Sequence, residues 1–160
     1  MAATIDLYQQ TGASPGTENG PISSFSFLGT GDYGNTLADR IADPVPAGGR
    51  SYSLWLKLKV AAAPDNQVSN FKLWCDSTPD ANLTYTVGIA GAYATPSASD
   101  NVATTDLTTY DSANKLTWDA GPLTDVGDAT DYAVLVLAAG SAAAAGNASV
   151  MTIEYSWDEV

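Results

Sequence analysis

Apolar and polar residues alternate strictly in several segments, and this alternation constrains the fold more than any other feature of the chain. In Ser51–Val60 the apolar residues fall on one side of an extended backbone: Tyr52, Leu54, Leu56, Leu58 and Val60. The polar residues Ser53, Lys57 and Lys59 fall on the other side. A period of two is typical of a β-strand that buries one face. Leu83–Ile89 and Met151–Trp157 repeat the pattern.

Shorter apolar segments complete a set of about eight predicted strands: Ile5–Tyr8, Phe25–Leu28, Asn70–Cys75, Lys115–Trp118 and Tyr132–Leu137. The last of these is apolar on both faces, which predicts a central strand covered on both sides. Helix signals are weak: Asn35–Ala42 allows one or two turns before Pro44. Ser141–Ala148 reads as a loop with a short helical turn.

Many short strands with long, turn-rich connections favour an all-β fold, an antiparallel β-sandwich of jelly-roll type. A length of 160 residues fits a single domain over residues 1–160. The strand register predicts a set of residues nearly inaccessible to solvent: Leu54, Leu56, Leu58, Val134, Val136, Ile153 and Tyr155.

The formal net charge is −12, from 18 acidic and six basic residues. A surface of this sign repels phosphate groups, so we expect neither nucleic acid nor an anionic membrane as a partner. The longest apolar runs are too short to cross a bilayer. A halophilic source explains the charge, and an acidic surface at ordinary salt is the alternative.

Residues suited to catalysis are scarce, and we expect no enzyme, no catalytic residue and no cofactor. The chain has no histidine, and its one cysteine, Cys75, alternates with Phe71 and Leu73 as a core residue would. Asp125, Asp128 and Asp131 form the best candidate for a calcium loop. They lack the spacing and the bidentate Glu of an EF-hand loop, and capping of local turns is the preferred explanation, so no metal site is predicted.

Three aromatic residues are the candidate interaction residues: Trp55, Trp74 and Tyr93. Trp55 and Trp74 fall on the polar side of their strands, which suggests a binding surface or a subunit interface. The alternative is that a loop or the second sheet covers them within the monomer.

Long segments without clear periodicity flank several strands: Thr11–Ser24, Gly29–Arg50 and Ala90–Asn114. Loops of this length are uncommon in a compact monomer. Two interpretations remain open: the segments become ordered against another subunit, or they contain short edge strands. The N-terminal part, residues 1–50, is therefore the region in which we expect contacts with partners.

Four motifs, SYSLWLKLKV from Ser51, VSNFKLW, AYATP followed by VATTDL, and the ending TIEYSWDE, resemble a group of small β-sandwich proteins of tailed viruses of bacteria and archaea. The similarity covers roughly residues 50–160. It implies a virion component, either a capsid decoration protein or another head or tail accessory protein, and it transfers no active site.

Two functions are therefore expected. The first is a structural protein of the virion, made in the host cytoplasm, which forms a homo-oligomer, preferably a trimer, and contacts the major capsid protein. The second is a carbohydrate-binding or receptor-binding module in which Trp55, Trp74 or Tyr93 stacks on a sugar ring.

The net charge of −12 generates a prediction about salt. Because salt screens repulsion between like charges, the unfolding midpoint of the isolated protein should rise steadily from low to molar sodium chloride. Thermal unfolding followed by circular dichroism measures it. A midpoint that stays constant over this range would contradict a high-salt adaptation and leave the fold unaffected.

Overall fold

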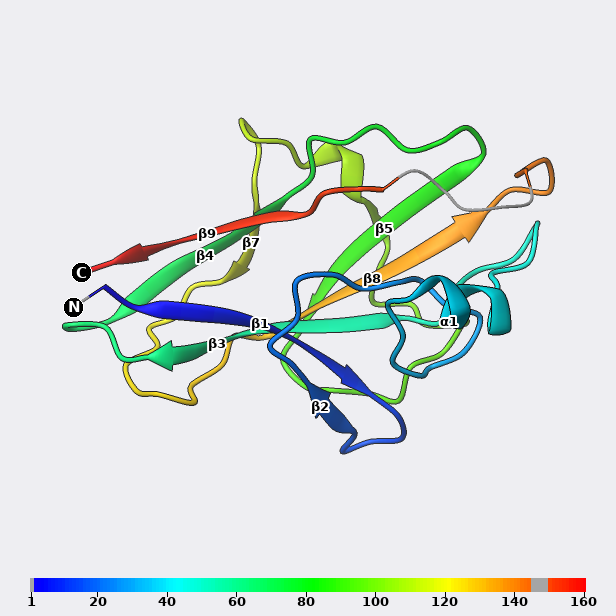
Figure 1. Ribbon diagram of the computed structural model, residues 1–160. Helices are drawn as coiled ribbons and strands as arrows, with labels where there is room; N and C mark the ends of the chain where they lie inside the picture. The colour runs from blue at the N-terminus through cyan, green and yellow to red at the C-terminus, as the bar shows by residue number, and fades with distance from the viewer. Residues whose placement is uncertain (1, 145–149) are drawn as a thin grey trace.

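The computed structural model describes residues 2–144 and 150–160, and in these residues nine strands form two antiparallel sheets. The larger sheet has the order β2 (Thr17–Asn19), β1 (Thr4–Thr11), β3 (Leu54–Ala62), β8 (Tyr132–Ala139), β5 (Leu83–Ala90) and β6 (Thr105–Asp106). The smaller sheet has the order β7 (Leu116–Asp119), β4 (Val68–Trp74) and β9 (Glu154–Glu159). The all-β sandwich is confirmed, whereas its jelly-roll type stays a prediction (Figure 1).

The strand predictions are confirmed except in one segment. Phe25–Leu28 is not a strand, although the carbonyl of Leu28 accepts a hydrogen bond from the amide of Tyr52 at 3.0 Å. Phe25 and Phe27 instead pack against the core as partly buried residues of an irregular segment. Hydrophobic burial alone therefore explains their apolar character, without a strand ladder. The residues of the predicted loop at 145–149 lie outside the described residues.

The predicted short helix is present as α1 (Leu37–Ala42). Thr36 caps it, since its hydroxyl accepts from the amide of Asp39 at 3.2 Å while the Asp39 carboxylate accepts from the amide of Thr36 at 2.9 Å. This reciprocal arrangement is a capping box, which fixes the start of a helix. Pro44 follows closely after the last turn.

The main core lies between the two sheets. From the larger sheet it receives the alternating Leu54, Leu56, Leu58 and Val60, together with residues of β5 and β8. From β4 it receives Phe71 and Leu73, and the neighbouring Cys75. Both contributions have the period of two seen in the sequence, so the register inferred for Ser51–Val60 is confirmed.

A second, smaller core lies on the outer face of the larger sheet. It contains Trp55, Val134, Val136 and Ala103. Because its neighbours on β8, Leu135 and Leu137, face the main core, β8 is buried on both faces, as its sequence predicts.

The loop between β5 and β6 covers this outer core and approaches β5 very closely at Gly88. A Cβ atom at that position would overlap the carbonyl oxygen of Val102 in the loop. Glycine therefore allows backbone to lie directly on backbone here.

Five of the seven predicted core residues are buried, namely Leu54, Leu56, Leu58, Val134 and Val136. For Ile153 and Tyr155 the prediction is wrong, since both are only half-buried. The reason is their position, because β9 is an edge strand of the smaller sheet and Ile153 precedes it. An edge strand has a neighbour on one side only, so period two reports the buried face but not the depth of burial.

The contact at Gly88 generates a prediction with a matched control. Gly88→Ala should lower the free energy of unfolding by about 1–3 kcal/mol, because the added methyl group must displace the covering loop. Gly91→Ala should change it by less than about 1 kcal/mol, because the nearest atom to a Cβ there is the Asp131 carboxylate oxygen at 3.6 Å. Urea unfolding followed by tryptophan fluorescence measures both. Equal effects of the two substitutions would contradict the role of Gly88.

Candidate functional site

Trp55, the first predicted interaction residue, is enclosed within the chain. Its side chain is 1% exposed, and its ring lies edge-on to Tyr93 at 5.3 Å and to Tyr132 at 5.7 Å between centroids. The indole nitrogen donates a hydrogen bond to the Ser53 hydroxyl at 2.9 Å. The interpretation that a loop covers Trp55 within the monomer is therefore the one the structure shows. A sugar ring could stack on it only if this cover moved.

Tyr93 links two loops on the outer face. Its hydroxyl donates to the carbonyl oxygen of Gly12 at 2.6 Å, and its ring lies against Gly16. Burial, with a smaller effect from the Tyr132 phenol, raises the pKa of Tyr93 to about 12. The hydroxyl therefore remains a hydrogen-bond donor at any ordinary pH. Tyr93 is thus partly buried and helps to hold the fold together.

Trp74 is also buried, at 7% exposure, and does not belong to either core cluster. The ammonium of Lys115 lies 3.9 Å from its ring centroid, a cation–π contact that covers the ring. Its indole nitrogen is buried and has no hydrogen-bond partner. Of the three predicted interaction residues, Trp55 and Tyr93 are in contact, whereas Trp74 lies on the other sheet.

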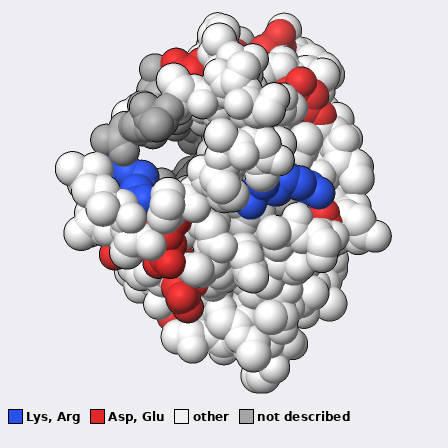
Figure 2. All heavy atoms as spheres, turned by 90° about the vertical axis from the view of Figure 1, so that its right-hand side faces the viewer, with Lys and Arg blue, Asp and Glu red and all other residues white. Residues whose placement is uncertain are grey.

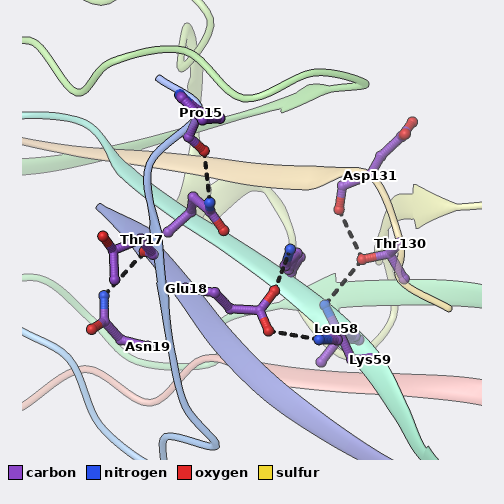
Figure 3. A network of polar contacts seen from close by, with 10 residues as sticks. Pro15, Thr17, Glu18, Asn19, Leu58, Lys59, Thr130 and Asp131 are labelled. Atoms are coloured by element: carbon purple, nitrogen blue, oxygen red, sulfur yellow. Dashed lines mark hydrogen bonds and ion pairs between the residues drawn. The ribbon is translucent and has the colours of Figure 1, made fainter. Parts of the chain in front are cut away.

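The segment Thr11–Ser24 is ordered within the chain. It contains the short strand β2, whose residues Thr17–Asn19 pair with β1. The Gln10 amide donates to the carbonyl of Pro15 at 2.9 Å, and the Asn19 amide donates to the Thr11 hydroxyl at 2.9 Å. The Asn19 amide also donates to the carbonyl of Thr17 at 3.2 Å, and Figure 3 shows these two residues side by side. Of the two interpretations of this segment, the missed edge strand is the one the structure shows.

Glu18 on β2 binds both lysines of β3. Its two carboxylate oxygens lie 2.6 Å from the ammonium groups of Lys57 and Lys59, as Figure 3 shows for Lys59. Burial alone would raise the pKa of Glu18, but the hydrogen bonds and charges of the two lysines outweigh it and lower the pKa. This contact fastens β2 across β1 onto β3.

Asp128 caps its own turn. Its carboxylate accepts from the amides of Thr124 and Asp125 at 2.9 and 3.0 Å, and these hydrogen bonds lower its pKa. The Asp131 amide donates to Asp119 instead, at 2.7 Å. Turn capping therefore accounts for Asp128. In residues 2–144 and 150–160 no group of three metal-ligating side chains comes together.

Helix α1 exposes an apolar surface that the sequence interpretation missed. Leu37 is 50% exposed, Ile41 is 70% exposed and Tyr33, just before the helix, is 39% exposed. We call these three residues the α1 surface. No residue of the helix is fully buried, although Arg40 is half-buried. The spacing of Leu37 and Ile41 was the available signal, because residues four apart share one face of a helix.

No known protein family matches the chain, and no curated protein or solved structure matches it either. Among the described helices, none is long and apolar enough to span a membrane.

The lowered pKa of Glu18 generates a prediction about acid unfolding. A carboxylate with a lowered folded-state pKa adds stability above its ordinary pKa of 4.5, and this stability disappears as the pH falls through the folded-state value. Glu18→Gln should therefore cost less than about 1 kcal/mol at neutral pH, given the partial exposure of the pair, and the difference from wild type should shrink on acidification. Urea unfolding between neutral pH and pH of about 3 measures it. Glu154→Gln, at an exposed position of β9, is the control. A difference that persists unchanged at low pH would contradict the ion pair.

Proposed function

We propose that this protein is a non-enzymatic structural component of a tailed-virus particle, a capsid decoration or other accessory protein at the virion surface. It acts as a homo-oligomer, preferably a trimer, that contacts the major capsid protein. The motifs quoted from residues 50–160 support the virion assignment through their resemblance. The sandwich fold is compatible with it, since such folds serve many functions.

The observation that carries the assembly part of the proposal is the α1 surface. A six-residue helix is too short to be stable in water on its own, so it is normally held by packing of an apolar face. Here Leu37 and Ile41 occupy one face and remain exposed in the monomer. Apolar residues gathered on an exposed, well-defined element are typical of a protein interface.

The position of the α1 surface agrees with the segment from which contacts with partners are expected. Tyr33, Leu37 and Ile41 all belong to Gly29–Arg50. The other long N-terminal segment, Thr11–Ser24, is held by β1 and Tyr93 within the chain. We therefore restrict the proposed subunit contact to Gly29–Arg50. Contacts with a partner would offset the conformational entropy that this segment loses on becoming ordered.

Charge limits where on a particle such a contact is favourable. With a net charge of −12, a position facing packaged DNA would place like charges together. An outer or peripheral position avoids this repulsion. A specific contact there should bury at least about 1,000 Å² in total.

Substitutions on the α1 surface test the proposal. In molar sodium chloride, the wild-type protein should sediment as an oligomer, and the double variant L37D/I41D should sediment as a monomer, because two carboxylates would be buried in the interface. Both should unfold at similar urea concentrations, since neither side chain contributes to the core.

Val126→Asp is the matched control, because Val126 is 63% exposed and lies outside Gly29–Arg50. It should leave the oligomer intact. A wild-type protein that sediments as a monomer would contradict the proposal and favour the binding-module alternative. So would an L37D/I41D variant that still forms the oligomer.

A further inference from the structure

The sandwich opens at one end into a cavity of about 810 Å³. Its wall includes side chains from the larger sheet, such as Leu83 and Tyr85 of β5 and Leu137 of β8. The irregular segment with Phe25 and Phe27 forms another part of the wall. Figure 2 shows a hollow on the face of the molecule that lies to the right in Figure 1. The volume falls within the range of small-molecule sites.

The cavity continues the main core. Tyr85 and Leu137 belong to that core, and Phe25, Phe27 and Leu83 pack against it while remaining half-buried. Phe27 lies edge-on to Tyr85 at 5.4 Å and to Phe25 at 6.0 Å, so the aromatic wall is fixed by its own contacts. This part of the wall presents an apolar surface to a ligand, as small-molecule pockets do.

Among the described residues that line the cavity, Arg40 is the one with a basic side chain. It is half-buried, and its guanidinium donates to the Ser26 hydroxyl at 3.1 Å. Arg40 takes part in neither ion pair of Glu18, with Lys57 or with Lys59. Hydrogen bonds of the helix cap lower the pKa of the neighbouring Asp39, and the charge of Arg40 lowers it further. Arg40 therefore places a positive charge beside an apolar wall in a chain with 18 acidic residues.

We propose that this cavity binds an aliphatic carboxylate, with its hydrocarbon chain against the apolar wall and its carboxylate paired with Arg40. Apolar contact supplies affinity along the chain, and the guanidinium, with several donors in one plane, suits a carboxylate. Asp80 also lines the cavity, so a cationic amphiphile is the competing ligand to test. Arg40 lies on α1 between Leu37 and Ile41, so the cavity adjoins the α1 surface.

Three probes of equal chain length test it on the purified full chain: dodecanoate, dodecan-1-ol and dodecylamine. Isothermal titration calorimetry at constant ionic strength should show one equivalent of dodecanoate bound, more tightly than either other probe. Arg40→Gln should weaken dodecanoate binding roughly tenfold or more and leave dodecan-1-ol unchanged. Arg50→Gln is the matched control, because Arg50 donates to the carbonyl of Asp100 and does not line the cavity. It should bind dodecanoate as the wild type does.

A second variant tests the cavity itself. Met151→Trp places a larger side chain at a half-buried position of the wall, so it should abolish binding of every probe while the urea midpoint shows that the protein is folded. Binding unchanged in Met151→Trp would overturn the proposal. So would preference for dodecan-1-ol or dodecylamine, or equal affinities in Arg40→Gln and wild type. If Met151→Trp instead abolishes self-association, a second copy occupies the cavity and the proposal also fails.

Discussion

Burial of β8 on both faces is the constraint on which the rest of the structure depends. Leu135 and Leu137 face the main core, while Val134 and Val136 face the outer one. The smaller sheet covers only the first face, so the second requires a cover from elsewhere in the chain. The loop between β5 and β6 provides it, and the close approach at Gly88 brings the loop near enough for Trp55 to be enclosed. Each buried apolar side chain of this kind contributes about 1.5–3 kcal/mol, which makes the outer core a large part of a marginal total stability.

The sequence predicts the sheets well and their surroundings less well, for a physical reason. The alternation in Ser51–Val60 predicts one buried face, and the apolar run Tyr132–Leu137 predicts burial on both faces. Both predictions are confirmed, because each pattern depends directly on which side of the strand is covered. The burial of Trp55 could not be inferred from the same pattern. A residue on the polar side of a strand becomes buried when a distant loop covers it. Strand β2 was missed because its three residues have no hydrophobic pattern and are held by the contact of Glu18 with β3. The spacing of Leu37 and Ile41, four residues apart, indicates the apolar side of α1.

The outer face of the larger sheet and the region around α1 have different roles. On the outer face, Tyr93 and Glu18 fasten Thr11–Ser24 onto the larger sheet, so this segment belongs to the fold itself. Around α1 the chain instead exposes apolar side chains that the monomer does not cover. Gly29–Arg50 is therefore the part of the N-terminal region that we assign to a partner. The fold and the proposed interface thus occupy separate segments, and substitutions can distinguish them.

Amide hydrogen exchange, compared between free and assembled protein, tests the central claim most directly. We expect strong protection of β8 and of Thr17–Asn19 in both states, because their amides pair within the sheet. We expect weak protection of Leu37–Ala42 in the free protein and a marked increase on assembly. Equal protection of Leu37–Ala42 in the two states would contradict the claim that α1 is completed by a partner.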